Sequence, residues 1–393
     1  MDDKPHTRSN DRLGIHFAWE AGLFLCSAGL LFALLRSATG PFADAGWAGF
    51  ALALAPVLLA ATATAASMRV GAVNLAAGPI AFFSGWLFID ASGSGLAIAL
   101  GMSLGAAFFM GVATALLNTW LRIPSWATSI VLGGSLILIA RGTPSTFMAA
   151  TLQSKAVYAA LGAAVGLSLL LGFVGAVPSL RDKLQANRDT AGDDWRPHPW
   201  ITVLGVILSC LAAGGAGVVF AWGSSTADAA VLVDPVEVGL AAFAAALLGG
   251  TSPFGRRGGF TGTFLASTAI LAAMWFAESR GWFDPLWVAL GAIVFGFIVS
   301  RFIETWNSAE EEEASQIERA GDVDDLKEDD TTVLPAPRSE LGSGSGGDDD
   351  FAAMATGTNL FGDAPGADTG SQKPVDPFGE VPASSGKSFN FRR

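Results

Sequence analysis

Residues 237–263 read Glu237-Val-Gly-Leu-Ala-Ala-Phe-Ala-Ala-Ala-Leu-Leu-Gly-Gly-Thr-Ser-Pro-Phe-Gly-Arg-Arg-Gly-Gly-Phe-Thr-Gly-Thr263. The stretch begins as an apolar helix of the kind found in membranes and stops at residues 249–253. Arg256, Arg257 and two more glycines follow before another apolar helix starts near Phe260. A flexible, proline-containing break with paired cations predicts a place where a membrane domain bends or docks a partner.

The composition of the whole chain agrees with a membrane protein. Of its 393 residues, 51% are hydrophobic and 15% are charged, a profile typical of a chain that crosses a membrane several times. Residues 1–307 carry equal numbers of acidic and basic side chains, so residues 308–393 hold the entire net charge of −12.

Apolar runs predict about ten membrane-spanning helices, since a crossing needs roughly 20 apolar residues. The predicted spans are 16–35, 46–67, 72–89, 94–118, 125–141, 154–177, 200–222, 237–250, 260–278 and 284–302. The segments 72–89 and 237–250 are short and glycine-rich, which favours re-entrant or broken segments as an alternative to clean crossings. The predicted fold is therefore an all-α polytopic membrane helix bundle.

Three regions follow from these patterns. Residues 1–15 are predicted to be a cytoplasmic leader and residues 16–305 the transmembrane domain. Residues 306–393 are predicted to be a disordered, acidic cytoplasmic tail, because they are rich in Asp, Glu, Gly, Ser and Pro and poor in large aliphatic side chains.

Positive charges orient the ten predicted spans, because cytoplasmic connections carry an excess of Lys and Arg. With the N-terminus inside, the inner connections hold Arg69, Arg122, Arg181, Lys183, Arg188, Arg196, Arg256, Arg257 and Arg301. The outer connections 37–45, 90–93 and 223–236 hold no Lys or Arg, although Arg141, Lys155 and Arg280 fall on the outer side. This asymmetry predicts a multi-pass protein of the plasma (inner) membrane with both termini in the cytoplasm.

Two further segments carry polar side chains at membrane depth. The first, Gly71-Ala-Val-Asn74-Leu-Ala-Ala-Gly78-Pro79, places a carboxamide between two glycines. Since glycine lets a helix break, Asn74 is predicted either to line a polar pathway or to hydrogen-bond a neighbouring helix. The second, Ala115-Leu-Leu-Asn118-Thr-Trp-Leu-Arg122-Ile-Pro124-Ser125-Trp126-Ala-Thr128, ends one span and opens the next, and its tryptophans are expected to be interfacial anchors.

Taken in order, these segments resemble the permease subunit of bacterial ABC importers of the ribose/monosaccharide type, relatives of the branched-chain amino-acid permeases. The shared pattern is Gly-x-x-Asn-Leu-x-x-Gly at 71–78, Leu-Leu-Asn…Leu-Arg-Ile-Pro at 116–124 and Leu-Gly-Gly-Thr-Ser…Gly-x-x-Gly-Gly…Gly-Thr at 248–263. The resemblance covers about residues 45–305 and implies import of a small polar solute of the sugar type. It also implies a second permease subunit, in a homo- or heterodimer, a cytoplasmic ABC ATPase subunit and an extracytoplasmic solute-binding protein.

The resemblance assigns roles to particular residues. Asn74, Asn118, Ser125 and Thr128 become candidates for the substrate pathway, and Gly71, Gly78, Gly249 and Gly250 for structural hinges. Arg181, Lys183, Arg188, Arg256 and Arg257 are expected to face the ATPase. Residues 249–259 lack Gly-Lys-Ser/Thr, so ATP is expected to be used by a partner subunit. The chain itself is expected to have no catalytic residue, no cofactor, no metal site and no nucleic-acid partner.

The chain departs from that family at two places. The family usually has an acidic residue where this chain has Asn74, and Ser-Val-Gly where it has residues 76–78. The ATPase-docking loop of the family carries Asn-Glu-x-Ala-Ala-x-x-x-Gly-Ile, whereas residues 180–195 lack this pattern and predict only a short amphipathic helix at 179–187.

A second hypothesis is therefore kept, a membrane scaffold or regulator that recruits a cytoplasmic partner through its tail. Two Phe-Gly islands seventeen residues apart, at Phe361 and Phe378, are the candidate docking motifs.

Overall fold

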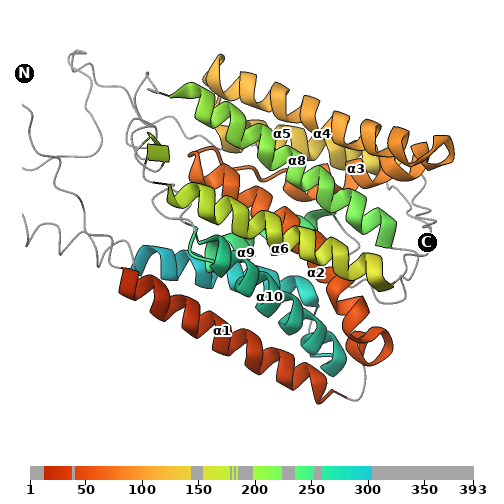
Figure 1. Ribbon diagram of the computed structural model, residues 1–393, viewed down its shortest axis with the longest axis vertical. Coiled ribbons are helices and arrows are strands. Elements are labelled where there is room, and N and C mark those ends of the chain that lie inside the picture. Colours follow the sequence, from red (N-terminus) through yellow and green to blue (C-terminus); the bar gives the residue numbers. More distant parts are fainter. Residues whose placement is uncertain are drawn as a thin grey trace, which may run out of the picture. The chain divides into compact units, whose positions relative to one another are not determined.

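The computed structural model describes residues 13–37, 40–142, 154–177, 179–180, 183–184, 198–223, 235–251, 259–282 and 284–302. These residues form helices joined by turns, with no strand among them, which confirms the all-α fold class (Figure 1). The helices are α1 (Leu13–Leu35), α2 (Pro41–Arg69), α3 (Ala77–Ala91), the 3-10 turn η1 (Ser92–Ser94), α4 (Leu96–Thr119), α5 (Ser125–Gly142), α6 (Ser154–Ala176), α8 (Pro199–Gly223), α9 (Pro235–Leu248), α10 (Phe260–Arg280) and a last helix, Pro285–Phe302.

By length and composition, six of the described helices are long and apolar enough to cross a membrane, namely α1, α2, α4, α6, α8 and the last helix. This supports a membrane-embedded, multi-pass protein. The helices α3 and α9 have 15 and 14 residues. At 1.5 Å per residue they are about 22 Å long, shorter than the hydrocarbon core of about 30 Å. The two segments predicted to be short, 72–89 and 237–250, thus contain helices too short to cross the hydrocarbon core by themselves. The sequence predicted ten crossings, whereas helix length and composition support six among the described residues.

Helix α8 lies against three other helices and makes its most extensive contacts with α2, α3 and α4. Its approach to α3 is so close that a Cβ added at Gly217 would overlap the carbonyl oxygen of Ala81, and one added at Gly85 would lie 2.7 Å from the carbonyl oxygen of Gly217. On the α4 side, a Cβ at Gly111 would lie 2.9 Å from Cα of Ile207. Small residues allow this backbone contact, which is how helices associate where lipid competes equally for apolar side chains.

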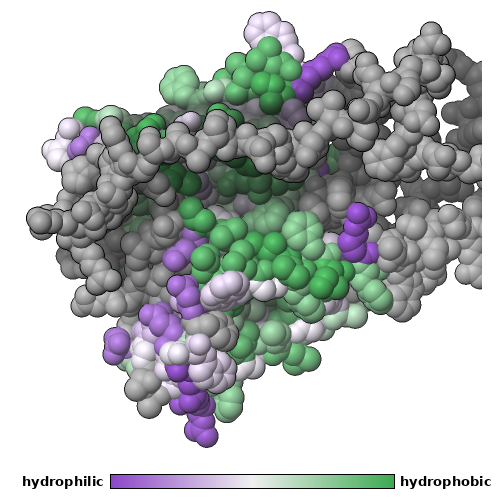
Figure 2. All heavy atoms as spheres, turned by 180° about the vertical axis from the view of Figure 1, so that it is seen from behind, coloured by the Kyte–Doolittle hydropathy of each residue, from purple (hydrophilic) through white to green (hydrophobic). Residues whose placement is uncertain are grey.

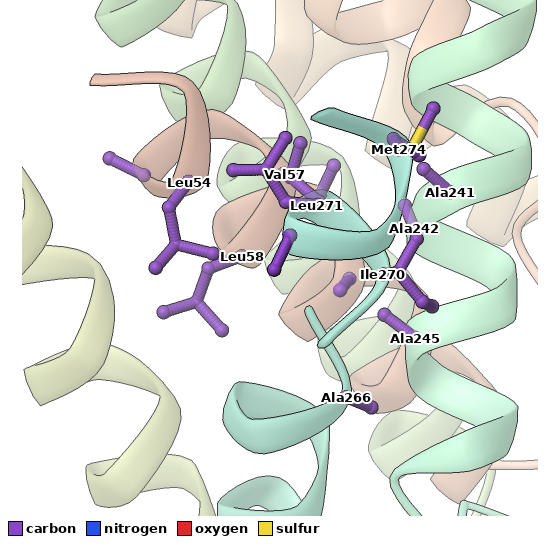
Figure 3. Packing of buried hydrophobic residues seen from close by; sticks show 14 of the residues in the cluster. Leu54, Val57, Leu58, Ala241, Ala242, Ala245, Ala266, Ile270, Leu271 and Met274 are labelled. Atoms are coloured by element: carbon purple, nitrogen blue, oxygen red, sulfur yellow. The ribbon is translucent and has the colours of Figure 1, made fainter. Parts of the chain in front are cut away.

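A second packed region joins α2, α9 and α10. Figure 3 shows side chains of α10 between leucines of α2 and a row of alanines on α9. The alanines Ala241, Ala242 and Ala245 are fully buried, so α10 packs directly on the backbone of α9. Trp275 of α10 is also fully buried and meets Phe50 of α2 edge-on at 5.4 Å between ring centroids.

The surface of the bundle carries large apolar side chains. Phe109 on α4, Leu25 on α1 and Trp287 on the last helix are 70%, 69% and 65% exposed. On the face seen in Figure 2, hydrophobic side chains form a broad area and hydrophilic ones gather near its borders. Such a surface is stable in lipid and would aggregate in water.

The segments singled out from the sequence gather at one end of the bundle. Met68 of α2 packs in one cluster with Leu247 of α9, and Val70 packs in another with Ala115 of α4 and Ile201 of α8. At the opposite end, Oγ of Ser37 lies 3.0 Å from Oγ of Ser279, where α1 and α10 finish. In Figure 1 the first end is on the left, where α1 and α8 begin.

The predicted boundaries at the two termini stay predictions. Helix α1 begins at Leu13, so it includes the last residues of the predicted leader 1–15. The predicted tail, 306–393, lies outside the described residues.

We expect the free energy of unfolding to be sensitive to any atom added at the close contact between α3 and α8. The substitution Gly217→Ala should lower the free energy of unfolding by about 1–3 kcal/mol, because the added methyl meets backbone that cannot move aside cheaply. The measurement is reversible unfolding in mixed micelles of a mild detergent and sodium dodecyl sulfate. Gly215→Ala is the matched control on the same helix, since a Cβ there meets nothing within 4 Å. Equal effects of the two substitutions would contradict this account of the contact.

Candidate functional site

Helix α2 is stopped by Gly71, one of the predicted hinges. Gly71 has a φ of 70°, which L side chains rarely adopt. Its N–H donates to the carbonyl of Met68 at 3.0 Å, and the N–H of Ala72 donates to that of Ser67 at 3.0 Å. This paired arrangement is the Schellman motif, which satisfies the last carbonyls of a helix. The chain then runs in irregular backbone to Ala76 before α3 begins.

Asn74 lies in the middle of that irregular segment, where it is 3% exposed. Its Nδ2 donates to Oγ of Ser209 at 3.0 Å, and its second neighbour on α8 is Sγ of Cys210 at 3.7 Å. Its Oδ1 accepts from the N–H of Ala76 at 3.0 Å, and its own N–H donates to Oγ of Ser67 at 3.0 Å. The carboxamide of Asn74 therefore joins α8 to the start of α3, and its backbone N–H bonds α2, which is the neighbouring-helix alternative predicted for Asn74.

Helix α5 closes over the same segment. Oγ of Ser129 lies 3.0 Å from the carbonyl oxygen of Val73, which would otherwise be unpaired at the helix break. Gly133, one turn further along α5, lets the helix approach residue 76, since a Cβ there would lie 3.5 Å from the Cβ of Ala76. The break is thus held by α5 on one side and by α8 on another.

Asn118, Ser125 and Thr128 come together where α4 turns into α5. Oγ1 of Thr128 donates to Oδ1 of Asn118 at 2.6 Å and lies 2.9 Å from the carbonyl oxygen of Ser125. Nδ2 of Asn118 is buried and has no hydrogen-bond partner among the described residues. The turn itself requires Arg122 to take a φ of 54°, an uncommon conformation for a residue other than glycine.

The second Gly-rich break, after α9, repeats the geometry that ends α2. Gly250 has a φ of 86°, its N–H donates to the carbonyl of Leu247, and the N–H of Thr251 donates to that of Ala246, both at 3.0 Å. Gly249 touches the start of α10, because a Cβ on it would meet backbone atoms of Gly262 and Thr263. Gly249 and Gly250 therefore have separate roles, one in close packing and one in stopping the helix.

Gly78 is placed differently from the other predicted hinges. It is a buried residue in the first turn of α3, and its Cα is 3.6 Å from where a Cβ on Gly239 of α9 would lie. Among the described residues it therefore serves as a contact point between α3 and α9, and the break lies just before it.

Only part of the predicted ATPase-docking surface is described. Lys183 is helical, its Nζ is 6.0 Å from the centroid of the Trp200 ring, and Leu180 and Leu184 pack on the cluster around Val70 and Ile201. Leu180 and Leu184 are thus apolar contacts on one side of the segment 179–187, for which the sequence predicts an amphipathic helix. Arg181, Arg188, Arg256 and Arg257 lie outside the described residues, and their predicted roles stay predictions.

Several residues of these sites could not be found from the sequence. Ser209 and Cys210 look like ordinary residues of an apolar helix, and nothing in the pattern of α8 pairs them with Asn74, which is 135 positions away. Ser67 and Ser129 likewise stand in no sequence pattern that predicts their contacts with residues 73 and 74. The only available signal was the presence of small polar side chains near a helix break, where freed backbone groups need partners.

In the part of the chain that the structure describes, no three His, Cys, Asp or Glu side chains come together in a way that could hold a metal ion. Comparison of the chain with protein-family models, with curated proteins and with solved structures finds no match. The all-helical fold and the six long apolar helices indicate a helical, membrane-embedded protein, and the resemblance to importer permeases rests on the motifs alone.

We expect the Asn74–Ser209 hydrogen bond to stabilise the break directly. Asn74→Ala and Ser209→Ala should each cost about 1–3 kcal/mol of unfolding free energy, since each leaves a buried polar partner unsatisfied. In a double-mutant cycle the two losses should be non-additive by about 1 kcal/mol. Additive losses would show that the two side chains do not interact.

A separate prediction concerns the two helix stops. Gly71→Ala and Gly250→Ala should each lower the unfolding free energy by about 1–2 kcal/mol, because alanine is strained at positive φ even where its Cβ meets nothing within 4 Å. Gly134→Ala on α5 is the control, with equally open space and no positive φ. Calorimetry of the protein in detergent would measure the difference, and a loss in the control as large as in the other two would rule out backbone strain.

Proposed function

We propose that the chain is the permease subunit of an ABC-type importer for a small polar solute of the sugar type. The observation that carries the proposal is a helix break at residues 70–76, at one end of the helix bundle, in which Asn74 is buried and beside which the Asn118–Thr128 pair lies. Helix breaks in membrane proteins are tolerated where protein encloses them or where they line a polar cavity, and many transporters use such breaks in binding their solutes.

The proposal includes the topology predicted from the charges. Ten crossings, counting the short helices α3 and α9 and the helices α5 and α10, would put both termini in the cytoplasm. The end of the bundle that holds Arg69, Arg122 and Lys183 would then face the cytoplasm. An ATPase subunit would dock there, a solute-binding protein would dock at the opposite end, and a second permease subunit would complete the pore.

Within the proposed pathway, Asn118 is better suited to contact the solute than Asn74. Both polar atoms of the Asn74 side chain are already bonded, so Asn74 would meet a solute only by exchanging partners. Asn118 has Nδ2 without a partner among the described residues, and a solute hydroxyl or a water molecule would satisfy it.

We expect Asn118→Leu to reduce solute uptake at least tenfold per folded protein, with little change in membrane expression, since one lost hydrogen bond to a solute is worth about 1.4 kcal/mol or more. Thr128→Val is the matched control. It removes the hydroxyl that bonds Oδ1 and leaves Nδ2 in place, so uptake should fall much less. Uptake would be measured with radiolabelled monosaccharides in cells that lack the native gene.

The importer hypothesis itself is tested by purification of the full chain from its host membrane. We expect an ATPase subunit to co-purify, and vesicles containing both to hydrolyse ATP faster when solute and binding protein are present. Deleting residues 321–393 distinguishes the scaffold hypothesis: an importer should keep its uptake, whereas a scaffold should lose its partners. The proposal fails if no ATPase co-purifies and uptake is the same with and without the gene.

A further inference from the structure

Two adjacent residues near the start of α1 reach both ends of the connection between α9 and α10. Nε1 of Trp19 donates to the carbonyl oxygen of Leu248, the last residue of α9, at 2.8 Å. The carboxylate of Glu20 accepts a hydrogen bond from the backbone N–H of Gly262 in the first turn of α10. A Cβ on Gly259 would lie 3.5 Å from Oε1 of Glu20, so the carboxylate lies directly beside the N-cap residue of α10.

These contacts supply what the two helix ends lack. The first N–H groups and the last C=O groups of a helix have no partner within the helix. Gly259 has no side chain to cap α10, and Leu248 precedes a glycine pair. A carboxylate at a helix N-terminus also meets the positive end of the helix dipole. Trp19 and Glu20 therefore cap the end of one helix and the start of the next from a third helix.

The rest of α1 also packs along α10, and two serine hydroxyls add contacts there. Oγ of Ser27 lies 2.9 Å from the carbonyl oxygen of Leu265, and Oγ of Ser37 lies 3.0 Å from Oγ of Ser279. These hydroxyls contact the interior and the end of α10, beyond the residues that Trp19 and Glu20 contact. An effect of Trp19 and Glu20 on the connection can thus be separated from general attachment of α1 to the bundle.

We propose that Trp19 and Glu20 are positioning residues that fix the end of α9 and the start of α10 relative to each other. Through them α1 sets the spacing across the Gly249–Gly259 connection, the sequence that contains Arg256 and Arg257. Any effect of these two contacts on coupling to an ATPase rests on the proposed function. The positioning itself does not, because it concerns contacts within this chain.

The test uses the full chain in nanodiscs, with Cys26→Ala as background and Thr251→Cys as the probe. Thr251 is fully buried beside the connection and its hydroxyl has no partner among the described residues, so a thiol there should react slowly with a maleimide. Cys210, also fully buried but under α3 and α4, stays in place as an internal reference for loosening of the whole bundle. Labelling at positions 251 and 210 is separated by peptide mass spectrometry.

We expect Glu20→Ala to raise the labelling rate at position 251 roughly tenfold, which corresponds to about 1.4 kcal/mol, without changing labelling of Cys210. Glu20→Gln should have a smaller effect, because an amide oxygen still accepts from the N–H of Gly262 but carries no charge. Trp19→Phe should raise the rate several-fold by removing the indole donor. Ser27→Ala, which loses a contact between α1 and α10 away from the connection, should leave the rate unchanged.

Two outcomes would overturn the proposal. The first is equal labelling at position 251 in Glu20→Ala, Trp19→Phe and Ser27→Ala. The second is a parallel rise at position 251 and at Cys210 in both Glu20→Gln and Trp19→Phe, which would show general loosening. If labelling changes as expected while no ATPase co-purifies, the positioning holds and the importer hypothesis fails.

Discussion

Every backbone N–H and C=O group inside a lipid bilayer must find a partner within the protein, and the structure depends on how two helix breaks meet this requirement. After α2 and again after α9, a glycine at positive φ closes a Schellman motif and satisfies the last carbonyls of the helix. Further backbone groups at the breaks are bonded by side chains: Ser129 of α5 reaches Val73, Asn74 within the first break accepts from Ala76, and Trp19 of α1 reaches Leu248. The breaks are therefore possible only because the surrounding helices stand very close.

That closeness comes from residues with little or no side chain. Helix α8 meets α3 at Gly217 and α4 at Gly111, and α9 presents alanines to α10. Because apolar side chains gain little on leaving lipid for another helix, dispersion contacts and short backbone distances have to hold such a bundle together. The same closeness brings Ser209 within hydrogen-bonding distance of Asn74. The close packing and the polar contacts at the break thus both follow from the small residues on these helices.

The helix class, the location of most helices and the two breaks were predictable, because they depend on apolar run length and on local glycine patterns. The sequence pattern placed both breaks close to Gly71 and Gly250, where the structure has them. It could not predict that Asn74 would be fully bonded, since its partner Ser209 lies on a helix whose neighbours are decided by packing. The contact of Glu20 could not be predicted either, because its partner is a backbone N–H that no side-chain pattern reveals.

The contacts of Asn74 and Glu20 imply different mechanical roles for the two breaks. At residues 70–76, side chains from α2, α5 and α8 hold the irregular backbone from several directions, so moving it requires several hydrogen bonds to be exchanged together. On either side of residues 249–259, α1 contributes two side-chain contacts, from Trp19 to Leu248 and from Glu20 to Gly262, while Thr263 of α10 bonds the carbonyl oxygen of Gly259. A shift of α1 would break the Trp19 and Glu20 contacts and leave both the direct packing of α9 on α10 and the α3–α8 contact in place. If the bundle changes shape in a transport cycle, fewer side-chain hydrogen bonds between helices have to be exchanged at the connection after α9 than at residues 70–76, and those that do come from α1.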